Sequence, residues 1–127
     1  MAKRSVHLSE KTEALIGFLS DENRNGSKNY SGSINAGLLM LEALMTQSKP
    51  NFSEEEWVYL CNVYSGCAVE FTMPIRIASD IMDDAGTYDL TKIDSIGRGL
   101  IEKISIMSQC QQAAILWEIK KRWYLSA

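Results

Sequence analysis

The chain has 127 residues, of which 46% are hydrophobic and 23% charged, and its net charge is −3. This length suffices for one ordinary domain or two small ones, and no hydrophobic run reaches membrane-spanning length. No apolar signal region follows Lys3 and Arg4, and three irregularly spaced cysteines do not suit a disulfide framework. We therefore expect a cytoplasmic protein without membrane association, in which the cysteines are small core residues.

The first predicted element is a β-strand over residues 3–8. Its polar and apolar side chains alternate, so Val6 and Leu8 share one face. The opposite face is polar and carries Lys3, Ser5 and His7. Because an isolated strand leaves its backbone groups unpaired, we expect it to pair with the same strand of a second copy. The resulting antiparallel ribbon fits the major groove of duplex DNA, where Lys3, Ser5 and His7 can contact base edges and Arg4 adds positive charge.

Two helices are predicted next. Ser9 is a suitable N-cap for a helix that carries Leu15 and Leu19 on one stripe. After a polar loop over residues 21–30, a second helix begins at the small residues Ser31, Gly32 and Ser33 and continues to Met45. This helix is apolar nearly all round, so we expect it to be buried on most of its surface, as at the centre of a dimer.

This order of elements resembles the ribbon-helix-helix (Arc/MetJ-like) DNA-binding family, over about the first third of the chain. The resemblance rests on Lys3-Arg-Ser-Val-His-Leu-Ser-Glu and on Ser31-Gly-Ser-Ile-Asn-Ala-Gly-Leu. It implies that Lys3, Ser5 and His7 contact bases and that Ser31, Gly32 and Ser33 hold a backbone phosphate. The second role agrees with the anion affinity of helix amino ends. The loop over residues 21–30 is longer than the short turn usual in the family.

A second, helical region is predicted after Pro50, where Ser53 and Glu56 have the spacing of a capping box. We therefore predict a ribbon-helix-helix domain over residues 1–48 and a helical domain over residues 49–127. The overall fold class is mainly α. The spacing of apolar residues predicts helices over residues 54–64, from Pro74 to about Ala85, from about Thr91 to Met107 and after Ser108, with a further helical turn over residues 67–72.

Charge is distributed unevenly along the chain. Residues 53–94 contain nine acidic side chains against Arg76 and Lys92, whereas residues 1–11 contain Lys3, Arg4 and Lys11 against Glu10. Phosphate repels an acidic surface, so this middle region should face solvent or another protein rather than DNA. For Glu54 to Glu56 the simpler interpretation is a solvated helix start.

Neither catalysis nor a cofactor is indicated by the sequence. One histidine and three scattered cysteines do not supply a zinc site at a known spacing, and nucleotide-binding and hydrolase motifs are missing from the sequence. The Asp83-Asp84 pair is more typical of a solvated helix end than of a metal site. We therefore expect a protein that is not an enzyme and that holds no metal.

Aromatic residues cluster in two of the predicted helices: Trp57, Tyr59, Tyr64, Trp117, Trp123 and Tyr124. They could stack single-stranded nucleic acid or line a pocket, but their helical spacing beside apolar neighbours favours a core position. The basic run from Lys120 to Arg122 could contact phosphate, pair with the acidic region of a partner subunit, or only complement the helix dipole.

The sequence thus predicts a homodimer that binds double-stranded DNA, as a transcriptional repressor or a plasmid or phage DNA-organising protein. The second domain would supply higher oligomerisation or a surface for a protein partner or small effector. The alternative is a protein-interaction module, such as an antitoxin or inhibitor, that acts through the acidic helical region.

Overall fold

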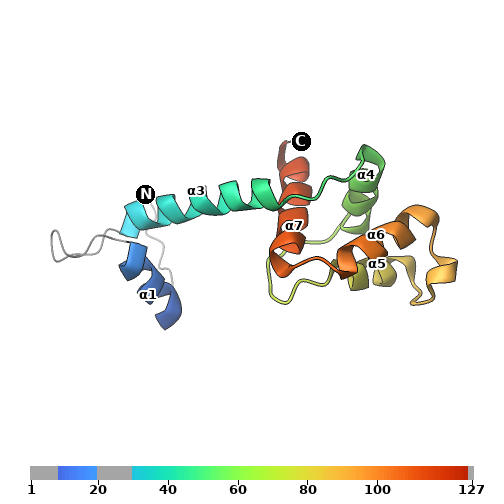
Figure 1. Ribbon diagram of the computed structural model, residues 1–127, viewed down its shortest axis with the longest axis horizontal. Helices are drawn as coiled ribbons and strands as arrows, with labels where there is room; N and C mark the ends of the chain where they lie inside the picture. Colours follow the sequence, from blue (N-terminus) through green and yellow to red (C-terminus); the bar gives the residue numbers. More distant parts are fainter. Residues whose placement is uncertain (1–8, 20–29, 126–127) are drawn as a thin grey trace. The chain divides into compact units, whose positions relative to one another are not determined.

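A computed structural model of the chain describes residues 9–19 and 30–125, and these residues are mainly helical (Figure 1). The helices are α1 (Glu10–Leu19), α3 (Tyr30–Ser48), α4 (Glu54–Val63), α5 (Ile77–Ala85), α6 (Ser95–Ser105) and α7 (Gln109–Leu125), with a 3₁₀-helix, η1 (Leu90–Lys92). The described residues contain no β-strand. The strand predicted over residues 3–8 lies outside the described residues, as do residues 21–29 of the predicted loop.

The chain divides into two compact units, residues 1–43 and residues 44–127. The division falls inside α3, whose last turn places Met45 in the core of the second unit. The sequence predicts the division slightly later, between residues 48 and 49, where Pro50 and Ser53 interrupt the helical pattern. That the first unit is a ribbon-helix-helix domain stays a prediction.

Helix α1 begins at the predicted N-cap. The backbone N–H of Thr12 donates a hydrogen bond to Ser9 Oγ at 3.2 Å, and Glu10 and Glu13 lie in the first turn, where the helix dipole favours negative charge. Leu15 of the predicted apolar stripe is exposed, whereas the neighbouring Ile16 is buried.

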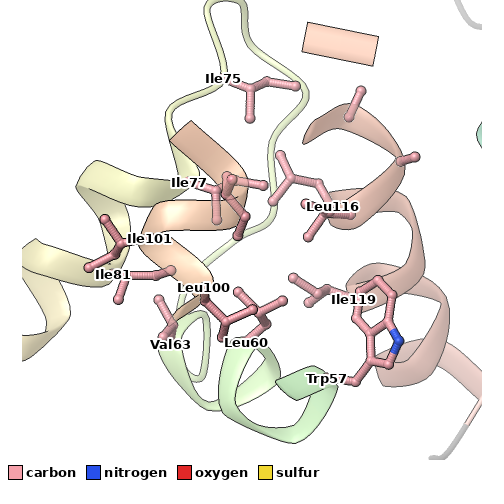
Figure 2. Close-up of a cluster of buried hydrophobic side chains, with 14 of the residues drawn as sticks. Trp57, Leu60, Val63, Ile75, Ile77, Ile81, Leu100, Ile101, Leu116 and Ile119 are labelled. Carbon is pink, nitrogen blue, oxygen red and sulfur yellow. The ribbon is translucent and has the colours of Figure 1, made fainter. Parts of the chain in front are cut away.

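The core of the second unit is built from apolar side chains of α4, α5, α6 and α7 (Figure 2). Its most deeply buried members are Leu60, Ile77, Ile81, Leu100, Ile104, Ile115 and Ile119. Helices α5, α6 and α7 each contribute two of these side chains four residues apart, as expected for one face of a helix. Full burial of one such side chain contributes about 1.5–3 kcal/mol, so this core is the main source of stability in the unit.

Helix α4 is fixed at its start by the predicted capping box. Ser53 Oγ accepts the Glu56 N–H at 3.2 Å, and Glu56 Oε1 accepts the Ser53 N–H at 3.0 Å. Lys103 Nζ of α6 donates to Glu56 Oε2 at 2.8 Å, and this bond, with that from the Ser53 N–H, lowers the pKa of the Glu56 carboxyl. Arg122 of α7 donates to both carboxylate oxygens of Glu54, at 2.9 and 3.3 Å. The start of α4 is therefore tied to two other helices.

The segment between α4 and α5 differs from the prediction. Residues 67–72 are not helical, so the predicted helical turn there is wrong. They follow Gly66, whose φ of 79° lies in the left-handed region that glycine adopts without strain. Helix α5 begins at Ile77 rather than near Pro74.

Two glutamine side chains of α7 bond to the backbone where this segment meets α5. Gln109 Oε1 accepts the Ile75 N–H at 2.6 Å, and Gln109 Nε2 donates to the Ile75 carbonyl at 2.8 Å. Gln112, which is buried, accepts the Ile77 N–H at 3.2 Å. The amide of Gln109 thus pairs with Ile75 much as a neighbouring strand would, and the backbone groups have partners without forming a helix.

Helix α6 begins later than the prediction near Thr91, which instead lies in η1. Asp94 is the N-cap and accepts the Gly97 N–H at 3.1 Å, so the helix starts at Ser95. Gly97 is required by close packing, because a Cβ atom there would collide with the Tyr59 hydroxyl and the Ile93 side chain.

Candidate interaction surfaces

The residues predicted to contact bases, Lys3, Arg4, Ser5 and His7, lie outside the described residues. The predicted phosphate contacts, Ser31, Gly32 and Ser33, lie in the first turn of α3. Ser31 and Gly32 are exposed there, whereas Ser33 is buried. An anion at this helix end would therefore meet Ser31 and the backbone rather than the Ser33 hydroxyl.

The middle of α3 carries an exposed apolar surface. We name the α3 apolar surface by its residues: Ile34, Leu38, Leu39, Met40 and Leu41, which are between 39% and 68% exposed. Successive residues of a helix point about 100° apart, so residues 38–41 face every direction around the axis. Within one copy these side chains are exposed on several faces of the helix, and their burial at the centre of a dimer stays a prediction. In the same unit, Phe18 of α1 is 83% exposed.

A cleft of about 760 Å³ lies beside α5 in the second unit, and it is acidic. The carboxylates that line this acidic cleft are Glu70, Asp80, Asp83 and Asp84, and Arg76 also lines it. Tyr64 Oη donates to Asp80 Oδ2 at 2.6 Å, and burial raises the pKa of the Tyr64 phenol. The phenol thus stays protonated at neutral pH and holds Asp80 in place. Such a cleft is suited to a cationic group.

The predicted acidic pair Asp83-Asp84 lies at the rim of this cleft. Asp83 accepts a hydrogen bond from the Tyr88 hydroxyl. Within residues 9–19 and 30–125, no group of three or more His, Cys, Asp or Glu side chains is placed to hold a metal ion.

A second cavity, of about 450 Å³, lies between the loop after α4 and the end of α7. This aromatic groove is lined by Cys67, Ala68, Val69, Lys120, Trp123 and Tyr124. Trp57 is buried as predicted, but Trp123 and Tyr124 are 44% and 74% exposed, so their predicted core position is wrong. Cys67 is likewise exposed rather than a core residue. The reason is that α7 continues beyond its last core residue, Ile119.

The basic residues of α7 have different surroundings. Arg122 pairs with Glu54 and, at 3.2 Å, with Glu118 of its own helix. Lys120 Nζ instead lies over two aromatic rings, 5.6 Å from the Phe71 centroid and 6.0 Å from that of Tyr124. Among the described residues, no carboxylate is paired with Lys120. Its charge is therefore held at the groove and available to an anionic group.

Comparisons of this chain with protein-family models, with curated proteins and with solved structures find no match. Among the described helices, none is both long and apolar enough to cross a membrane.

Proposed function

We propose that the chain is a dimeric, sequence-specific DNA-binding protein of ribbon-helix-helix type, either a transcriptional repressor or a DNA-organising protein. Its mechanism is binding without chemistry. A two-stranded ribbon formed by residues 3–8 of two copies contacts base edges through Lys3, Ser5 and His7, assisted by Arg4. The amino end of α3 fixes the register on a phosphate through Ser31 and the positive end of the helix dipole.

The observation that carries this proposal is the α3 apolar surface. A water-soluble chain gains little from four consecutive large apolar residues on an uncovered helix, and such surfaces typically mark an interface. Each side chain that a second copy buries contributes about 1.5–3 kcal/mol. The side chains that face the partner on each of two copies together can offset the roughly 4–15 kcal/mol that association costs. A second α3 supplies an equally apolar partner by symmetry.

The proposal is tested by gel shift against the DNA upstream of the coding region, at fixed salt. Replacement of Lys3, Ser5 or His7 by Ala should weaken specific binding by about 1–3 kcal/mol for each lost base contact, while the fold and dimer persist. Lys11→Ala is the matched control for Lys3→Ala, because it removes one exposed ammonium from α1, outside the ribbon. Unchanged operator affinity in all three ribbon variants would contradict the proposed contacts.

The alternative function is a protein-interaction module, an antitoxin or inhibitor. The acidic cleft favours it, because four carboxylates around one concave surface suit a basic protein segment better than DNA. Deletion of residues 1–8 separates the two functions. DNA binding should be lost and the dimer weakened if the ribbon is the contact element, whereas a partner held at the acidic cleft would still bind.

A further inference from the structure

The last turn of α5 and the loop that follows it present an aromatic residue, Tyr88, beside several carboxylates. We name this region the acidic tip, made up of Asp83, Asp84, Tyr88, Asp89 and Leu90. Tyr88 is 72% exposed and Leu90 is 39% exposed, although both are large and partly or wholly apolar. The tip therefore carries apolar surface with negative charge on both sides.

Hydrogen bonds hold the acidic tip in one conformation. The Tyr88 hydroxyl donates to Asp83, which fixes the direction of the ring. Asp89 Oδ1 accepts from the Thr91 N–H at 3.0 Å and from Thr91 Oγ1 at 2.7 Å, and the Asp89 N–H donates to Thr87 Oγ1 at 3.0 Å. A partner that binds this turn loses little conformational entropy, and exposed tyrosines on ordered turns are frequent centres of binding energy.

The aromatic groove is complementary to this tip in chemistry and in size. Its volume of about 450 Å³ is within the range of cavities that hold a ligand or a large side chain. Its walls are aromatic and aliphatic. Lys120 Nζ lies over the rings of Phe71 and Tyr124 and has no carboxylate partner among the described residues. Lys121 follows on the exposed side of α7. An aromatic side chain flanked by carboxylates can pack against the rings of the groove while its carboxylates attract the ammonium groups.

A strand of nucleic acid fits the groove less well. A nucleic-acid strand requires a row of basic side chains along several phosphates. Here Glu70 lies on the loop that forms one wall of the groove, and the acidic cleft shares Cys67 and Ala68 with the groove. The acidic tip requires only local positive charge beside a single aromatic contact.

Figure 1 shows α7, whose end forms one wall of the aromatic groove, on one side of the second unit and the turn between α5 and α6, which carries Tyr88, on the other. A copy therefore cannot fill its own groove with its own tip. Two different surfaces that bind each other form a heterologous contact, which continues from copy to copy instead of closing into a pair.

We infer that the acidic tip of one copy docks in the aromatic groove of the next, so that second units associate head to tail. Tyr88 contacts the rings of Trp123 and Tyr124, and Asp84 or Asp89 approaches Lys120 and Lys121. This contact goes beyond the proposed function and does not depend on it. With dimers joined through α3, it would link neighbouring dimers along DNA.

The test is sedimentation velocity of the full chain over a range of concentrations at low and high salt. The native chain should form species larger than a dimer, and these should dissociate as salt rises. Tyr88→Ala at the tip and Lys120→Glu in the groove should each weaken this association about tenfold or more, as for other central interface residues. Far-ultraviolet circular dichroism checks that each variant is folded.

Two further measurements make the test specific. A mixture of Tyr88→Ala, which keeps its groove, with Lys120→Glu, which keeps its tip, should form species larger than a dimer at concentrations where neither variant does so alone. The controls are Val58→Ala, an exposed apolar residue on α4, and Lys103→Glu, which breaks the ion pair with Glu56 and lowers stability without touching the groove. Both controls should assemble as the native chain does.

The inference is overturned if the native chain forms no species beyond a dimer, if both variants assemble normally, or if the mixture fails to associate. None of these results bears on DNA binding by the ribbon. Conversely, loss of operator binding in the ribbon variants with unchanged head-to-tail association would leave this inference standing, so the two proposals fail independently.

Discussion

At Gly97, the residue type is explained by a contact between two helices. In a helix interior, glycine costs about 1 kcal/mol relative to alanine, so a glycine in α6 needs a reason. The reason at Gly97 is the Tyr59 side chain of α4, which occupies the space that a Cβ would need. Gly99, two residues later in the same helix, has no atom within 4 Å of a Cβ position and carries no such constraint.

This contrast gives a prediction for two matched substitutions. We expect Gly97→Ala to destabilise the fold by about 1–3 kcal/mol, because overpacking forces Tyr59 and Ile93 to move. Gly99→Ala should stabilise it by about 0.5–1 kcal/mol through the gain in helix propensity. Urea denaturation followed by circular dichroism measures both. Equal effects at the two positions would mean that the packing around Gly97 is not as described.

At the scale of elements, the helix starts are set by side chains that bond to their own first turns. Ser9, Ser53 and Asp94 each accept a hydrogen bond from the backbone N–H three residues later. The start of α4 is further fixed by Lys103, which joins the capping box to α6. Local capping and packing between helices thus reinforce each other at this point.

The capping box predicts a dependence of stability on pH. The folded state lowers the pKa of Glu56, so this carboxylate stabilises the protein above its ordinary pKa of about 4.3, and the contribution is lost as the pH falls through the lowered value. In Glu56→Gln, the part of the stability loss at low pH that comes from this carboxylate should disappear. Glu55→Gln, one residue earlier and exposed, is the control. The measurement is the melting temperature between pH 7 and pH 3, and equal profiles for the two variants would contradict this role.

At the scale of the whole molecule, the two units have different characters. The second unit has its own core in α4 to α7, whereas the described part of the first unit exposes the apolar side chains of α3 and Phe18 of α1. If these side chains are buried by a second copy, folding of the first unit is coupled to association, and its stability depends on protein concentration.

We therefore expect the melting temperature to rise with protein concentration, and Leu39→Lys to abolish that rise. Leu39 is 68% exposed in one copy, so in a monomer this change should alter stability by no more than about 0.5 kcal/mol. A buried lysine at a dimer seam would cost far more. Val58→Lys makes the same change at an exposed site on α4 and is the control. If the melting temperature of the native chain did not depend on protein concentration, the proposed dimer would be contradicted.

The sequence by itself determined the helical character of the described residues, the N-cap at Ser9 and the capping box at Ser53. These features depend on neighbours three or four residues away, which the sequence displays directly. Only the tertiary structure decided the extended segment before α5, because its partners Gln109 and Gln112 lie 34 and 35 residues further along the chain. It also decided the exposure of Trp123 and Tyr124, since an aromatic residue at helical spacing is core only where another element covers it. The acidic cleft and the aromatic groove likewise depend on how the loop after α4 folds back against α5 and α7, and no periodicity encodes that path.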